Sequence, residues 1–325
     1  MSAAEVSAAR PAGRVDVARI ARSGLAAWVI VAALVVGLTI DDAAGFWASP
    51  NIANVLTVVV VLGLVALGQN VVVLTGGIDL SVGSAATLAG MLTAILIDGY
   101  PIRVFPVIVL VLVVGALIGT AHGLLVARVK LPPFVVTLAT FYLLQGVAFM
   151  ISTSPTGQVT TGLSDFALQR SGPFPHALLV LVVAVLVVGA LLHLTPFGRH
   201  VYAVGGDQSA ARSNGVPVTR TLVLAYVVGG ALAAAAGIVL AARATVGSPT
   251  AGQGLELSAI TVVVIGGSSL LGGRGTIVGT LGGVALLALI ETSFTLLQID
   301  ATITDLIRGL VILAAAAIFV TRSER

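Results

Sequence analysis

The chain has 325 residues, of which 58% are hydrophobic and only 9% are charged, whereas soluble domains contain about 45–50% apolar and about 25% charged residues. This composition excludes a water-soluble globular fold and a disordered chain, and it predicts an all-α, polytopic membrane protein. The formal net charge of +3 does not indicate a nucleic-acid partner, because the arginines stand at the edges of apolar runs. There are no cysteines, and the histidines have no metal-binding spacing, so we predict no disulfide and no metal site.

The apolar runs set the expected domain organisation. Residues 1–23 are polar and basic and should form a cytoplasmic tail, followed by an apolar run from Gly24 to Ile40. A signal peptide has the same shape, but the apolar runs beyond it favour an uncleaved first helix. Further apolar segments follow at about 52–74, 81–97, 104–126, 134–151, 176–194, 221–242, 257–271, 276–297 and 303–320. We therefore predict about ten transmembrane helices within a permease domain over residues 24–320, and a C-terminal tail over 321–325.

The positions of the basic residues predict the orientation in the membrane. With ten spans and a cytoplasmic N-terminus, 12 of the 16 basic residues lie on the cytoplasmic side. They are Arg10, Arg14, Arg19, Arg22, Arg128, Lys130, Arg199, Arg212, Arg220, Arg274, Arg322 and Arg325. Cytoplasmic loops of membrane proteins carry such an excess, so both termini are expected in the cytoplasm.

The longest predicted cytoplasmic loop covers residues 195–220. Within it, Asp207 to Ser213 could form a short helix, with Asp207 as its N-cap and its end near Gly215, before Pro217. Such a helix could be a solvated connector or could dock a soluble partner. The sequence of the loop does not by itself distinguish a solvated connector from a docking helix.

The segment from Gly68 to Gly90 would be continuously apolar but for the polar side chains of Gln69, Asn70, Thr75, Asp79, Ser81 and Ser84. Gly76-Gly77 should break a helix, and non-helical backbone at membrane depth persists only where it is buried in protein or lines a wet cavity. One interpretation is a cytoplasmic turn in which Asp79 or Ser81 caps the next helix. The other is a translocation path, and both can hold together. The candidate path or gate residues are Gln69, Asn70, Thr75, Gly76, Gly77, Asp79 and Ser81.

Two further features concern the last spans. The glycine-rich break at 266–275 is expected to be a tight turn between closely packed helices. Glu291 and Arg308 lie equally far from the predicted turn near Asp300 and could pair across a hairpin, whereas Asp305 could instead contact Arg308 on one helix face. A structural ion pair is favoured over a proton relay. An even split of the spans also allows an inverted repeat, although no internal identity is visible.

No enzyme signature is present. The chain has no phosphate-binding loop and a single lysine, and it lacks the usual metalloprotease and serine-hydrolase motifs. It is not expected to be an enzyme.

Three motifs carry a resemblance. VVVLTGGIDLSVGS (71–84), GRHVYAVGGDQSAARSNGV (198–216) and PTAGQGLELSAITVVVIGGSSLLGGRGTIVGT (249–280) resemble the permease subunits of bacterial sugar ABC importers, in the ribose/xylose/arabinose/galactose/autoinducer-2 branch. The resemblance extends from about residue 50 to the end. Where many relatives have Gly-Gly-Asn-Glu, this chain has Gly205-Gly206-Asp207-Gln208, which moves a negative charge but keeps an N-cap.

The resemblance implies a type II importer permease in the bacterial inner membrane that works as a homodimer or with a paralogous permease. An extracytoplasmic binding protein would deliver the sugar, and a cytoplasmic ATPase would bind ATP, so that this chain needs no cofactor of its own. The segment around Asp79 would line or gate the path. By the same resemblance, the residues that couple the permease to the ATPase would be Gly198, Arg199, Asp207, Ala211, Arg212 and Gly215.

Two other functions stay open at this point. One is a secondary transporter that is ion-coupled through Asp79 or Glu291. The other is a membrane scaffold or sensor that uses the 195–220 loop to recruit a partner.

Overall fold

A computed structural model of the chain describes residues 25–296 and Gly309. The predicted tails at 1–23 and 321–325 and the predicted span at 303–320 lie outside these residues, apart from Gly309. The described part is a bundle of helices with one short β-hairpin, β1 (Arg170–Ser171) paired with β2 (Phe174–Pro175). The predicted all-α, polytopic class is thereby confirmed.

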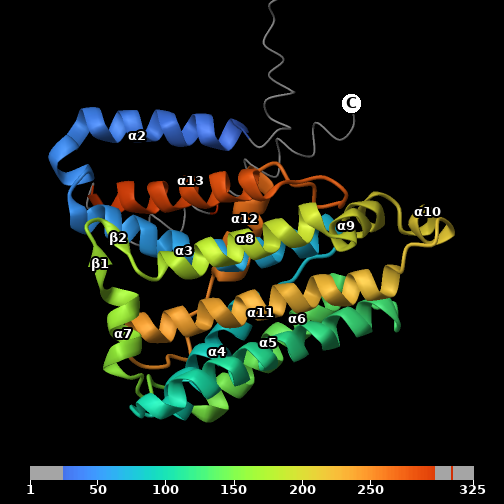
Figure 1. The fold of residues 1–325 in the computed structure, drawn as a ribbon, viewed down its shortest axis with the longest axis horizontal. Coiled ribbons are helices and arrows are strands. Elements are labelled where there is room, and N and C mark those ends of the chain that lie inside the picture. The colour runs from blue at the N-terminus through green and yellow to red at the C-terminus, as the bar shows by residue number, and fades with distance from the viewer. Residues whose placement is uncertain (1–24, 297–308, 310–325) are drawn as a thin grey trace, which may run out of the picture.

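Long apolar helices make up most of the bundle (Figure 1). They are α2 (Leu25–Phe46), α3 (Ser49–Leu74), α5 (Val104–Ala127), α6 (Pro133–Ile151), α8 (Leu178–Leu194), α11 (Val218–Ala244) and α13 (Ile277–Leu296). Two apolar helices are shorter, α4 (Val82–Ile97) and α12 (Leu255–Ile265). The remaining elements are η1 (Pro101–Arg103), α7 (Thr161–Leu168), α9 (Pro196–Gly206) and α10 (Gln208–Ser213).

The number of spans differs from the sequence expectation. Within the described residues, six helices are long and apolar enough to cross a membrane, or seven if α8 and α9 form one span bent by 74°. The predicted count of ten is therefore not confirmed. Two of the remaining predicted spans correspond to the shorter helices α4 and α12, which follow irregular segments at residues 75–81 and 245–254. A third, at 303–320, lies outside the described residues apart from Gly309.

Helices α3 and α11 form the centre of the bundle. In their most apolar stretches, 72% of the α3 residues and 61% of the α11 residues are buried, against 6% for α2. Helix α5 packs on α11 through Gly115, Gly119 and Gly123, where a Cβ atom would overlap the α11 backbone. Small residues at this spacing let helix backbones approach closely inside a membrane.

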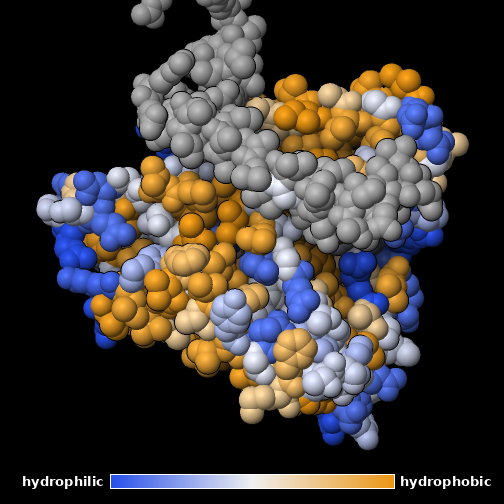
Figure 2. Space-filling view, turned by 180° about the vertical axis from the view of Figure 1, so that it is seen from behind, coloured by the Kyte–Doolittle hydropathy of each residue, from blue (hydrophilic) through white to orange (hydrophobic). Residues whose placement is uncertain are grey.

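The outer surface of the bundle suits a lipid environment. Large apolar side chains on α5 and α6 are exposed, including Phe105, Leu117, Leu143 and Met150. Figure 2 shows a broad apolar surface beside the hydrophilic end at the left of that view.

The two ends of the bundle carry different elements (Figure 1). Helix α7 and the β-hairpin lie at one end, and α9 and α10 lie at the other, which we call the α10 end. The first irregular segment, 75–81, follows α3 at the α10 end. The second, 245–254, follows α11 at the opposite end. It runs back beside α4, where the Gly252 N–H donates to Thr87 Oγ1 at 2.9 Å. A central helix, an irregular segment and a short helix thus occur twice, in opposite directions. This is the arrangement that an inverted repeat would produce.

Candidate functional site

Helix α3 ends in a Schellman motif at the predicted glycine pair. The Gly77 N–H donates to the Val72 carbonyl at 3.2 Å, and the Gly76 N–H donates to the Val73 carbonyl at 2.9 Å. Gly76 has a φ of +82°, a conformation that glycine adopts without a Cβ clash. The sequence expectation of a helix break is confirmed at this position.

Asp79 is buried just beyond this break and holds the start of α4. Its side chain is 2% exposed. Its carboxylate Oδ1 accepts hydrogen bonds from the Ser81 backbone N–H at 2.8 Å and from the Ser81 hydroxyl at 2.7 Å. With its amide nitrogen toward the Asp79 carbonyl, Gln69 donates to that oxygen at 3.0 Å and accepts from the Asp79 N–H at 3.3 Å. The segment 75–81 is therefore a buried turn fastened to α3.

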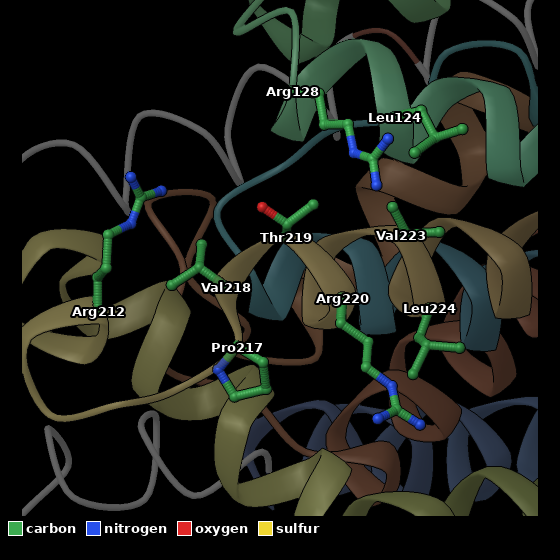
Figure 3. Close-up of a pocket in the computed structure, with 9 residues that line it drawn as sticks. All are labelled: Leu124, Arg128, Arg212, Pro217, Val218, Thr219, Arg220, Val223 and Leu224. Atoms are coloured by element: carbon green, nitrogen blue, oxygen red, sulfur yellow. The ribbon is translucent and has the colours of Figure 1, made fainter.

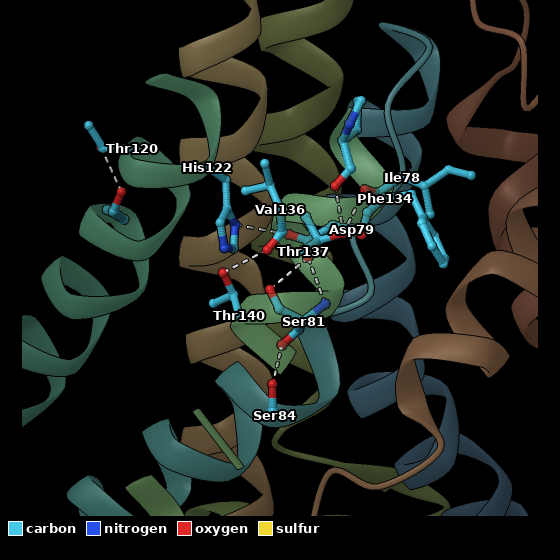
Figure 4. A network of polar contacts seen from close by, with 12 residues as sticks. Ile78, Asp79, Ser81, Ser84, Thr120, His122, Phe134, Val136, Thr137 and Thr140 are labelled. Carbon is cyan, nitrogen blue, oxygen red and sulfur yellow. Dashed lines mark hydrogen bonds and ion pairs between the residues drawn. The ribbon is translucent and has the colours of Figure 1, made fainter. Parts of the chain in front are cut away.

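The nearest ionisable partner of Asp79 is His122, which the sequence reasoning missed (Figure 4). His122 Nδ1 of α5 lies 3.7 Å from Asp79 Oδ2, and both side chains are buried. The Tyr226 ring of α11 meets the His122 ring edge to face, with 6.0 Å between centroids. An ionisable residue inside an apolar run is by itself a sign of a functional site, so His122 could have been found. We call Gln69, Asp79, Ser81, His122 and Tyr226 the inner cluster.

Several polar atoms near the inner cluster have no hydrogen-bond partner among the described residues. They include both ring nitrogens of His122 and the Tyr226 hydroxyl. A buried polar group without a partner costs about 1–3 kcal/mol. Gly77 lets the Tyr226 hydroxyl approach, since a Cβ atom there would lie 2.6 Å from that oxygen. The cluster is therefore a polar core in which Gln69, Asp79 and Ser81 have hydrogen-bond partners and the His122 ring and the Tyr226 hydroxyl do not.

The cluster lies close to the α10 end of the bundle. His122 is five residues before the end of α5, about 8 Å along the helix. Thr137, near the start of α6, places its hydroxyl 3.2 Å from the Ile78 carbonyl. Figure 4 shows this contact between α6 and the segment 75–81. Asp79 thus lies in a turn that is buried in protein, and its role in a translocation path stays a prediction.

Two other predicted path residues point elsewhere. Asn70 Oδ1 accepts a hydrogen bond from the Ser268 hydroxyl at 2.8 Å, which ties α3 to the 266–275 loop. The Thr75 hydroxyl donates to the Val72 carbonyl of its own helix at 2.7 Å.

The predicted coupling segment contains two helices rather than one. Helix α9 occupies the first part, and Asp207 then caps α10, its Oδ1 accepting from the N–H groups of Ser209 at 2.7 Å and Ala210 at 2.9 Å. Gly215, with a φ of +78°, follows the end of α10. The predicted short helix, its cap and its end are confirmed.

The six predicted coupling residues fall into two groups. Arg199, Asp207, Arg212 and Gly215 are exposed, whereas Gly198 and Ala211 are buried. Ala211 packs on Val204, Val218 and Leu222 of its own chain. Its side chain therefore supports α10 from within and does not face outward.

A basic groove lies beside α10 (Figure 3). Its volume is about 480 Å³. It is lined by Leu124, Arg128, Arg212, Pro217, Val218, Thr219, Arg220, Val223 and Leu224. The three arginines are exposed, and no acidic partner of theirs is found within the described residues.

The predicted pair between Glu291 and Arg308 falls partly outside the described residues, since Arg308 and Asp305 are not among them. Glu291 lies on α13 and is half-buried. The pair stays a prediction.

Comparisons with known proteins agree with this geometry. Residues 51–316 match the family model described as the permease component of the branched-chain amino acid transport system. The chain is 40% identical over 274 residues to the ribose import permease protein RbsC of Bacillus subtilis, covering 82% of this chain and 83% of the relative. It is 40% identical over 256 residues to the inner membrane ABC transporter permease protein YjfF of Escherichia coli, covering 76% of each chain.

A third relative is the fructose import permease protein FrcC of Rhizobium meliloti, 37% identical over 282 residues, covering 84% of this chain and 78% of the relative. No solved structure matches the chain.

The bundle of apolar helices is that of a polytopic membrane protein, and the comparisons identify its class as transport permeases. The chain belongs to the BPD_transp_2 family of transport permeases.

Proposed function

We propose that this chain is the membrane-spanning permease subunit of an ABC importer for a monosaccharide or a similar small polyol. An extracytoplasmic binding protein would deliver the sugar, a second permease copy would complete the path, and a separate cytoplasmic ATPase would supply energy. The chain itself would carry no catalytic activity and bind no cofactor. The observation that carries the proposal is the 40% identity to a ribose import permease over 82% of this chain.

The substrate class follows from the relatives and from the side chains at the break. The family description names branched-chain amino acids, but the individual relatives named for a substrate carry ribose or fructose in their names. The two ionisable groups of the inner cluster, Asp79 and His122, face each other at 3.7 Å. The other groups of the cluster are an amide, a hydroxyl and a phenol, which suit the hydroxyls of an uncharged sugar.

The inner cluster is proposed as the gate nearest the cytoplasm. In the described conformation the segment 75–81 fills the space between α3, α5, α6 and α11 and holds Asp79 against His122. Opening of this segment would expose hydrogen-bonding groups that lack partners in the closed state. Sugar hydroxyls or water could then satisfy them, which lowers the cost of the open state.

The energy source is proposed to act at α10. Exposed polar residues on α10 and the neighbouring arginine groove form a cationic surface that is complementary to acidic side chains of a docked protein. Because the chain has no phosphate-binding loop, ATP must act through such a contact.

Reconstitution tests the proposed function. Vesicles with this permease, its partner ATPase and a sugar-binding protein should accumulate sugar only when ATP is present on the ATPase side. Uptake that persists without ATP and collapses with a protonophore would instead indicate an ion-coupled secondary transporter. A folded, ATPase-bound complex without any sugar flux would favour a scaffold.

Cysteine labelling tests the orientation. The α10 end carries Arg128, Lys130, Arg199, Arg212, Arg220 and Arg274, which we assign to the cytoplasm. Ser209, an exposed residue of α10, should label as Ser209→Cys with a membrane-impermeant thiol reagent only from the cytoplasmic side, in this cysteine-free chain. Ser323→Cys should behave in the same way. Labelling of Ser209→Cys from outside would reverse the assignment.

A further inference from the structure

Three backbone segments meet at the α10 end without side chains between them. They are the end of α3 at Leu74–Gly76, the end of α9 at Gly205–Gly206, and the loop at Gly272–Gly273. The Gly273 N–H donates to the Leu74 carbonyl at 3.0 Å. A Cβ atom on Gly272 would lie 2.7 Å from the Gly205 carbonyl oxygen and 2.8 Å from the Gly76 nitrogen. We call this contact the glycine junction.

Gly205 is the tightest position of the junction. A Cβ atom there would overlap the Leu74 carbonyl oxygen and the Gly273 nitrogen. Because its φ lies outside the left-handed region, the backbone conformation alone does not require glycine at this position. The requirement comes from the neighbouring backbone.

A side chain reinforces the contact one helical turn earlier. The Tyr202 hydroxyl of α9 donates to the Gly275 carbonyl at 3.0 Å. The loop is also tied to α3 by the bond from Ser268 to Asn70 at 2.8 Å. The loop 266–275 is therefore fastened to α9 on one side and to α3 on the other.

The glycine junction lies between the proposed ATPase-docking helix α10 and the proposed gate segment 75–81. Asp207, the cap of α10, follows Gly205 by two residues, and Asp79 follows Gly76 by three. Backbones in direct contact in a close-packed interior cannot shift independently. We propose that the glycine junction transmits a displacement of α9 and α10 to the segment 75–81, with Gly205 and Tyr202 as positioning residues. This inference rests on the proposed function.

A matched pair of alanine variants tests the inference. Gly205→Ala introduces the overlap, whereas a Cβ atom on the adjacent Gly206 meets nothing within 4 Å. A reporter cysteine replaces the partly exposed Ile78 in the gate segment. Its thiol labelling rate is measured in the complex with the ATPase, with and without ATP, and this measurement needs no sugar.

With the native junction, ATP should change the labelling rate of Ile78→Cys. Gly205→Ala should abolish that change and lower binding-protein-stimulated ATP hydrolysis by about tenfold, while Gly206→Ala should retain both. Copurification of the ATPase checks that each variant assembles. If Gly205→Ala does not accumulate in the membrane, Tyr202→Phe tests the inference instead. This variant removes only one hydroxyl and should weaken the ATP-dependent change in the labelling rate.

The inference would be overturned if Gly205→Ala and Gly206→Ala showed the same ATP-dependent change in the labelling rate. If Gly205→Ala does not accumulate, an unchanged labelling response in Tyr202→Phe would overturn it. An ATP-independent labelling rate in a complex that does transport sugar would overturn it as well. A native complex that shows an ATP-dependent labelling change but no sugar flux would contradict the proposed function and leave the junction supported.

Discussion

Replacement of Asp79 by alanine should lower sugar transport by about tenfold or more while the permease still assembles with its ATPase. The carboxylate accepts two hydrogen bonds from Ser81 and faces His122 inside the bundle. Hydrogen bonds to a charged group contribute about 1.5–3 kcal/mol, and 1.4 kcal/mol corresponds to a tenfold change in an equilibrium. Without them the segment 75–81 loses its closed geometry. Initial uptake rates and ATPase copurification from the same membranes provide the measurement.

Asparagine at position 79 is the matched control. Its Oδ1 atom can accept the same two bonds from Ser81, but it carries no charge toward His122. We expect Asp79→Asn to transport more than Asp79→Ala and less than the native chain. Full transport by Asp79→Ala would reduce Asp79 to an ordinary turn residue.

Replacement of Gly215 by valine should uncouple the permease from the ATPase. Gly215 ends the α10 region with a φ of +78°. A left-handed conformation costs roughly 1–2 kcal/mol for most residues and more for β-branched ones. The chain would leave that conformation, and α10 would lose its position. Binding-protein-stimulated ATP hydrolysis and transport should fall together, by about tenfold, while the affinity of the binding protein for sugar is unchanged.

Asparagine again provides the control, since it tolerates the left-handed region better than other non-glycine residues. Gly215→Asn should therefore retain most of the stimulated hydrolysis. The space around this position does not limit the side chain, because a Cβ atom on Gly215 meets nothing within 4 Å. Normal stimulation in Gly215→Val would show that the coupling contact lies elsewhere.

The structure also changes the best choice of variants at α10. Replacing Ala211 with tryptophan looks from the sequence like a steric block against the ATPase. Because Ala211 is buried against Val204, Val218 and Leu222, a tryptophan there would displace α10 from its own chain. An exposed residue such as Arg212 is the better probe of direct contact.

Local features of the protein were predictable from the sequence alone. Apolar composition determines the membrane class, because few charged groups can be transferred into lipid. The helix break at Gly76 and the cap at Asp207 depend on interactions within a few residues of the chain, so the residue types specify them.

Only the tertiary structure decided which distant residues meet. His122 and Tyr226 approach Asp79 because α5, α11 and the break pack together, and the glycine junction joins segments up to about 200 residues apart. The lengths of α4 and α12 were also set by irregular segments that pack against other helices. Hydropathy along the chain reports how each residue partitions into lipid, whereas these contacts depend on helix packing, which no local pattern specifies.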